Sequence, residues 1–291
     1  MRCTESIDGK SGCSERRRGG DAGNLTKEGL AMKCAEVRER LEILSPPKFA
    51  ESWDNVGLLC GRAGKEIKKV YIAVDATDEV IENAIDAEAD LLLTHHPLIF
   101  SPLKKVNDEN FISRRIVKLL QADMCYYAMH TNFDVMGMAD AAADTLALKD
   151  RQVLYVTFED EIAKEGIGRF GRLPEEMTLA DCAEYVKKTF QLPAVRVYGE
   201  LSDVISVAAV SPGSGKSTAQ SAVNAGVDVL ISGDIDHHLG IDLVAQGVSV
   251  IDAGHYGLEK IFVPYMQDYF KKEMPEIAVE IAEEKSPFAV I

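Results

Sequence analysis

Five imidazole or carboxylate side chains follow apolar runs in this 291-residue chain, at His95, His96, Asp134, His255 and Glu259. The six cysteines show no close pairs and no spacing suited to zinc, so the candidate ligands are nitrogen and oxygen atoms without a thiolate. Such a set suits iron, zinc or manganese better than calcium or a soft metal cluster. These residues therefore predict a site for divalent metal.

The spacing of the five residues indicates two ions. A helix would place His255 and Glu259, four residues apart, on one face, where both can bind the same ion. The second oxygen of Glu259 can bridge to another ion. His95 and His96 are neighbours on a segment that Pro97 keeps extended, so their side chains diverge and each would serve a different ion. Five ligands for two ions leave open positions, which are typical of catalytic or substrate-binding metals.

The other three histidines leave two interpretations open. His130, His237 and His238 either orient the ligands or a substrate, or are hydrogen-bonded residues at helix starts. We expect Asp234 and Asp252 to act as caps rather than as ligands.

A Gly-rich segment, Ser211–Ser217, looks like a phosphate loop. The phosphate-loop pattern needs a glycine five residues before Gly215, where Val210 stands. We therefore expect a structural turn rather than a phosphate cradle.

Strands and helices alternate along the predicted elements, which indicates the α/β class. The run Leu91–Leu93 is typical of a strand buried on both faces of a parallel sheet, and ligands in such sheets lie beyond the carboxyl ends of the strands. The other expected strands span 69–74, 124–129, 166–173, 195–198, 204–210, 227–231 and 248–251. The expected helices span 30–44, 78–88, 111–121, 139–146, 217–225, 237–246 and 255–272, and a further helix begins after Thr178.

A weak internal repeat indicates two related βαβ halves. Residues 225–232 match residues 87–94 in residue class, including the aspartate and the final hydroxyl. We assign the two ligand-bearing halves to 29–150 and 204–291, with a scaffold section at 151–203. The single tryptophan, Trp53, is expected to anchor the core.

Composition narrows the function classes. A net charge of −15 and a pI near 4.9 disfavour nucleic acid as a partner, since such proteins carry a basic patch. No apolar run approaches the roughly 20 residues of a membrane span, and unpaired cysteines suggest reduced thiols in the cytoplasm. Residues 1–28 lack a periodic apolar face, and we expect a disordered extension there.

At four segments and one further residue the sequence resembles the NIF-three-like family, whose members carry the name GTP cyclohydrolase I type 2. The matching residues are Trp53–Leu58, Thr94–Leu98, His130–Asp134, Asp252–Tyr256 and Glu259. The resemblance implies two intertwined α/β domains, a homohexamer and a dinuclear metal site with ligands at His95, His96, Asp134, His255 and Glu259. Asp234 departs from the glutamate usual in the family, and Val135–Ala139 varies the usual turn.

Two functions follow as hypotheses. The first is a metal-dependent hydrolase that acts on a small-molecule substrate, with GTP suggested by the resemblance and Glu259 holding the bridge between two ions. The second is a non-catalytic metal-binding protein that handles iron, assists cofactor assembly or regulates a partner.

Overall fold

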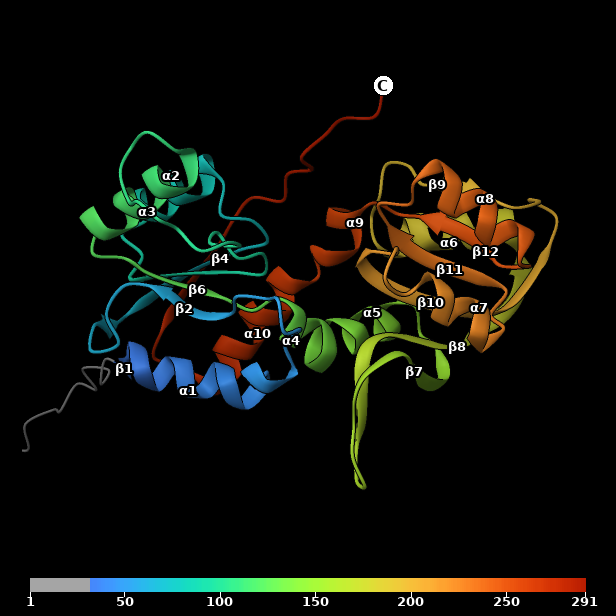
Figure 1. The fold of residues 1–291 in the computed structure, drawn as a ribbon, viewed down its shortest axis with the longest axis horizontal. Coiled ribbons are helices and arrows are strands. Elements are labelled where there is room, and N and C mark those ends of the chain that lie inside the picture. Colours follow the sequence, from blue (N-terminus) through green and yellow to red (C-terminus); the bar gives the residue numbers. More distant parts are fainter. Residues whose placement is uncertain (1–31) are drawn as a thin grey trace, which may run out of the picture. The chain divides into compact units, whose positions relative to one another are not determined.

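The computed structural model describes residues 32–291, which belong to one compact unit. The extension expected at 1–28 lies outside the described residues. Two main sheets, one of five and one of six strands, carry the helices on their faces (Figure 1). None of the helices in this described part is long and apolar enough to span a membrane.

The first sheet has the strand order β13-β4-β5-β6-β2, in which only β2 runs antiparallel to its neighbour. Its strands are β2 (Gly57–Cys60), β4 (Lys69–Ala73), β5 (Leu91–Thr94), β6 (Cys125–Ala128) and β13 (Ala278–Ile281). Its helices are α1 (Cys34–Leu44), α2 (Asp78–Asp86), α3 (Phe111–Gln121) and α10 (Phe262–Glu273). Helices α2 and α3 cover one face, and α1 and α10 cover the other (Figure 1). A two-stranded ribbon of β1 (Met32–Lys33) and β3 (Glu66–Ile67) and a 3-10 helix, η1 (Pro47–Phe49), accompany this sheet.

Alternating residues of β5 enter the two cores on either side of the sheet. Leu91 and Leu93 pack with α1 and α10, and Leu92 packs with α2 and α3. Burial on both faces explains the uninterrupted apolar run and confirms the predicted parallel strand.

The second sheet has the order β7-β8-β10-β11-β12-β9, with a parallel centre of β10, β11 and β12. Its strands are β7 (Lys149–Glu159), β8 (Lys164–Thr178), β9 (Arg196–Tyr198), β10 (Val204–Ser214), β11 (Val229–Gly233) and β12 (Ser249–Asp252). The helices of this half are α5 (Ala139–Thr145), α6 (Leu179–Thr189), α7 (Ala219–Ala225), α8 (His237–Ala245) and α9 (His255–Glu259). One hydrophobic core lies between this sheet and helices α5 and α6, and a second lies on the opposite face, under α7 and α8.

An aspartate makes the same pair of hydrogen bonds at matching positions of the two halves. Asp90 Oδ2 accepts hydrogen bonds from the backbone N–H groups of Lys68 and Lys69. Asp228 Oδ2 accepts from the N–H groups of Ser206 and Val207 in the same way. Each aspartate thus joins the start of its strand to the start of the preceding strand, which confirms the prediction of related βαβ halves.

Several predicted boundaries are wrong. The helix expected over 255–272 is two helices, because ψ near −19° at Lys260 and Ile261 tightens the chain into a 3-10-like turn between α9 and α10. The first part of the Gly-rich segment continues β10 to Ser214, which pairs with Gly233, and the expected turn begins only at Gly215. Helix α7 begins two residues later than expected, at Ala219.

The section 151–203 contains a long hairpin of which only part was predicted. β7 and β8 pair antiparallel and extend beyond the other strands of their sheet (Figure 1), and Phe158 near their connecting end packs against Phe49 of η1, with ring centres 5.1 Å apart. Most residues of β7 are exposed or half-buried, yet its run Val153–Phe158 is rich in β-branched and aromatic residues, a strand signal that the sequence prediction did not use. Helix α6 follows as expected, with the Thr178 hydroxyl accepting from the N–H of Asp181.

A π-helix follows β6 and the short helix α4 (Thr131–Phe133), in a stretch where the sequence predicted a loop before a helix. The π-helix, η2, spans Asp134–Met138 and continues into α5. Such wide turns are rare and occur mostly at functional sites. Gly137 lies in this turn, directly against the buried ring of Phe133.

Replacing Gly137 by alanine is expected to destabilise the fold. The added Cβ would lie 2.3 Å from Cε2 of Phe133, whose ring packs against Phe262 and Tyr265. We expect the free energy of unfolding to fall by about 1–3 kcal/mol, although alanine favours a helix more than glycine does. Urea unfolding measures this, with Gly64→Ala as control because a Cβ at Gly64 meets nothing within 4 Å. Unchanged stability in Gly137→Ala would contradict the packing constraint.

Candidate metal centre

The five predicted ligands come together from three strand ends. His95 and His96 follow β5, Asp134 opens the π-helix after β6, and His255 and Glu259 begin and end the short helix α9 after β12. β5 and β6 are parallel neighbours in the first sheet, so His95, His96 and Asp134 lie at one edge of it, whereas His255, 159 positions after His96, reaches the site from the second sheet. His95 and Glu259 are buried, and His255 is the most exposed of the set, at 34% of its side chain.

The five residues form two groups that share Glu259. One group is His95, Asp134 and Glu259, and the other is His96, His255 and Glu259; within each, one ligand atom per residue lies within 4.8 Å of the others. His95 Nε2 is 3.5 Å from both Asp134 Oδ1 and Glu259 Oε1. Glu259 Oε2 is 3.1 Å from His96 Nε2 and 3.0 Å from His255 Nε2. The two adjacent histidines are divided between these two groups, but both also belong to a third candidate group, with His130.

Each of the three histidines is held through its other ring nitrogen. The Nδ1–H group donates in every case, so the Nε2 lone pair is left for the centre of the site. The pairs are His95 with the carbonyl of Met129 (2.7 Å), His96 with Asp75 (2.8 Å) and His255 with Asp234 (2.7 Å). This is the arrangement that protein ligands to metals usually have.

The donor atoms at the centre fit divalent metal. His95 Nε2, Asp134 Oδ1 and Glu259 Oε2 are buried and have no hydrogen-bond partner within residues 32–291. Buried polar atoms without partners are costly, so a native structure that keeps three of them together needs an explanation. Gly213 supports the fit, because a Cβ there would lie 2.6 Å from Glu259 Oε1 and would crowd the carboxylate.

Without metal, protons on two histidines balance the buried carboxylates. Burial lowers the pKa of His96, but Asp75 and Glu259 outweigh it and raise that pKa to about 10. Burial likewise lowers the pKa of His255, while Glu259 and Asp234 raise it to about 9. Bound metal would replace these protons, since ligand imidazoles must be neutral.

The pKa values of the two buried carboxylates are shifted in opposite directions. Burial tends to raise the pKa of Glu259, but the neighbouring His95, His255 and His96 hold it well below its usual range. Burial dominates at Asp134 and raises its pKa, with His95 only partly opposing the shift. Glu259 is therefore the carboxylate around which the positive charge of the site gathers.

His130 lies beside this centre. One of its ring nitrogens is within 4.8 Å of ligand atoms of His95 and His96, and its Nδ1–H donates to Asp54 at 2.8 Å. Asp54 also accepts from the hydroxyl and the N–H of Thr131. Of the two interpretations left open, the structure favours a residue that acts next to the candidate ligands.

His237 and His238 lie elsewhere. Both are exposed at the start of α8, and neither belongs to the candidate ligand groups found in residues 32–291. Asp236 caps this helix by accepting from the N–H of Leu239. These two histidines therefore follow the alternative interpretation, as residues at a helix start.

Trp53 corrects the expectation of a core anchor. It is 55% exposed, and its ring lies 5.6 Å from Phe100 and 6.0 Å from His130. A large aromatic residue is buried by default, but this one packs on an exposed ring at the edge of the site.

Sequence reasoning missed the carboxylates that hold the histidines. Asp75 follows β4 just as the candidate ligands follow their strands, so the same strand-end signal was present there. Asp234 also follows a strand, β11, but it was expected to be a cap, whereas it accepts from His255; only Asp54 gave no such signal. Asp252 does behave as a cap, since it accepts from the N–H of Gly254.

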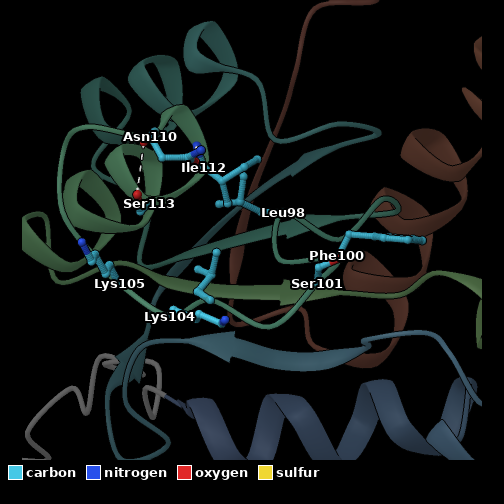
Figure 2. A pocket seen from close by; sticks show the side chains of 9 residues that line it. Leu98, Phe100, Ser101, Lys104, Lys105, Asn110, Ile112 and Ser113 are labelled. Atoms are coloured by element: carbon cyan, nitrogen blue, oxygen red, sulfur yellow. Dashed lines mark hydrogen bonds between the residues drawn. The ribbon is translucent and has the colours of Figure 1, made fainter.

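A cavity of about 590 Å³ opens on the second ligand group. His96, His255 and Tyr256 line it together with Arg115. A second cavity of about 480 Å³ shares Leu98 and Ile112 with the first. Figure 2 shows the second cavity, whose wall includes Lys104 and Lys105.

Known proteins resemble the chain over most of its length. The chain is 31% identical over 264 residues to the GTP cyclohydrolase 1 type 2 homolog of Clostridium perfringens, a match that covers 89% of this chain and 100% of the relative. The structure of the hypothetical protein SA1388 of Staphylococcus aureus, 31% identical, covers 90% of this chain and 100% of that chain with a TM-score of 0.81.

A third similarity concerns the fold alone. The structure of a Bacillus cereus protein related to NIF3, 23% identical, covers 90% of this chain and 99% of that chain with a TM-score of 0.82. The model of the family described as Duf34/NIF3 (NGG1p interacting factor 3) matches residues 32–287. The family resemblance of the four sequence segments is thereby confirmed, and the chain belongs to the Duf34/NIF3 family.

Proposed function

We propose that the chain binds two divalent metal ions, of iron, zinc or manganese, and acts as a hydrolase of the GTP cyclohydrolase I type 2 kind. The observation that carries the proposal is the pair of ligand groups that share Glu259 around three buried atoms without partners. Bound ions would supply Lewis acidity and lower the pKa of water toward neutrality. His95 and Asp134 would hold one ion, and His96 and His255 the other.

Glu259 is the proposed catalytic residue because its two oxygens serve both groups. Oε1 faces His95, and Oε2 faces His96 and His255. Its position in α9, one turn after His255, fixes the carboxylate on the same side as that imidazole.

His130 is the group we propose to move a proton. Burial would raise the pKa of Asp54, but the hydrogen bond and charge of His130 and the bonds from Thr131 lower it to about 2. The ionised Asp54 keeps the ring proton on Nδ1 of His130 and leaves Nε2 able to accept a proton.

A nucleotide is the proposed substrate class. The names of the relatives suggest GTP, and a cavity of about 590 Å³ beside the centre has the size of a small-molecule site. The acidic net charge supports a small molecule rather than nucleic acid. Assembly into a homohexamer and a cytoplasmic location stay predictions.

A non-catalytic metal-binding role is the second candidate. It is favoured by the pairing of the carboxylates that line the cavity: Asp75 bonds to His96 and Asp234 bonds to His255. Carboxylates engaged in this way are poor general bases. This protein would take up metal for iron handling, cofactor assembly or regulation without turning over a nucleotide.

Elemental analysis of protein purified without added metal tests the centre. We expect about two equivalents of iron, zinc or manganese per chain, and a loss of metal in His255→Ala because one ligand group would keep only two side chains. His238→Ala is the matched control, since His238 is exposed and lies outside the candidate groups. Equal metal content in the two variants would rule out the assigned ligands.

Incubation of metal-loaded protein with GTP tests catalysis. We expect GTP to be consumed, and the rate to fall by roughly 100-fold or more in His96→Ala and Glu259→Gln. Chromatography of the nucleotide measures consumption, and His237→Ala is expected to keep the wild-type rate. Full metal content with no turnover of GTP or of a broad nucleotide panel would decide for the non-catalytic role.

We expect the protein to lose stability in acid because Asp54 becomes protonated. Its pKa in the folded protein, about 2, lies below the ordinary 3.8, so its stabilising effect is complete above the ordinary value and disappears as the pH falls toward 2. The difference corresponds to roughly 2 kcal/mol. Urea unfolding of the wild type and Asp54→Asn at pH 6 and pH 2.5 measures it. Parallel pH dependence in both proteins would show that Asp54 is not held in this way.

A further inference from the structure

We propose that Arg115 and Thr77 bind an oxyanion, a phosphate or a carboxylate, of the ligand that reaches the candidate metal centre. This inference rests on the proposed function, because it assigns the part of the substrate that does not react. Both residues line the cavity of about 590 Å³ that also contains His96 and His255. A group held by them would therefore share one open pocket with the second ligand group.

Arg115 is fixed before any ligand arrives. Its Nε and Nη2 atoms donate to the two oxygens of Asp78, at 3.1 and 3.3 Å, and its guanidinium carbon lies 5.2 Å from the ring centre of Phe111. Only 17% of its side chain is exposed. This fork occupies one edge of the guanidinium and leaves Nη1, with two N–H groups, as the edge that a ligand can use.

The charge around Arg115 favours an anion. Arg114 approaches the same carboxylate, Asp78, at 3.7 Å, so two guanidinium groups share one negative charge. The remaining carboxylates of the cavity, Asp75 and Asp234, are engaged by histidine ring N–H groups. One positive charge near Arg115 is thus left for a ligand to balance.

Thr77 supplies a second donor. Its hydroxyl oxygen accepts from the N–H of Val80 and so caps α2. A hydroxyl that accepts in this way keeps its own proton free to donate. The serine variant keeps both roles, whereas the valine variant removes the donor together with the cap.

Calorimetric titration of the metal-free full chain with inorganic pyrophosphate and with succinate tests the proposal. We expect the dissociation constant of at least one anion to rise roughly 10- to 100-fold in Arg115→Met, because one charge-assisted contact is lost. In Arg114→Met we expect the same constant to change less than about twofold. Arg114 is the matched control because it carries the same charge on the same helix and shares Asp78, but does not line the cavity. If only pyrophosphate binding depends on Arg115, the group bound there is a phosphate. If only succinate binding depends on Arg115, the group is a carboxylate.

Thr77→Val is expected to weaken binding of the same anion, and Thr77→Ser is expected to restore that binding. Equal effects of Arg114→Met and Arg115→Met, or no effect of either in variants that keep the wild-type melting temperature, would overturn the proposal. The metal content of each protein as purified, measured before metal is removed for the titration, keeps the two proposals apart. Wild-type protein without metal would refute the proposed function, whereas intact metal with anion binding independent of Arg115 would refute only this inference.

Discussion

The burial of the Glu259 carboxylate among three imidazoles is the constraint on which the site depends. An ionised carboxylate that is 2% exposed needs compensating positive charge, and the side chains that supply it come from β5 of the first sheet and from α9, which follows the second sheet. The same carboxylate therefore connects the candidate metal centre to the arrangement of the two sheets. Gly213 in β10 leaves room for it, and the anchored Nδ1 atoms of the histidines direct their lone pairs toward it.

The path of the chain explains how residues from both halves reach one place. After α9 the chain returns to the first sheet, where α10 packs against β4 and β5, and β13 adds a parallel strand beside β4. The last helix thus packs into the core that also holds the first helix, α1. Intertwining of this kind makes the two ligand groups a property of the whole fold rather than of either half.

The parts of the site that sequence predicts are those with a strong local signal. Strand ends followed by histidine or aspartate identified four of the candidate ligands, the spacing from His255 identified Glu259, and the helix expected over 111–121 matches α3, Phe111–Gln121, at both ends. The carboxylates behind the histidines were missed, although Asp75 and Asp234 follow strands, because a hydrogen bond between side chains distant in sequence leaves no periodic trace. Asp54 and His130, for example, lie 76 residues apart.

Strands β7 and β13 were missed, although β7 contains the β-branched and aromatic run Val153–Phe158. β7 is largely exposed and β13 is a short edge strand, so pairing with neighbouring strands defines them and burial does not. Trp53 shows the opposite failure. Its size suggested a core position, but exposed aromatic neighbours accommodate it at the edge of the site.

The adjacent histidines after β5 have a mechanical consequence. His95 and His96 belong to different ligand groups but share one peptide bond, and both groups also share Glu259. A displacement of this strand end moves both groups at once. An ion held by one group would therefore fix the backbone and the carboxylate for the other, and the second ion would enter a position that is already ordered. If two ions bind as proposed, loading of the two positions would be cooperative, with singly loaded protein scarce at intermediate metal concentrations.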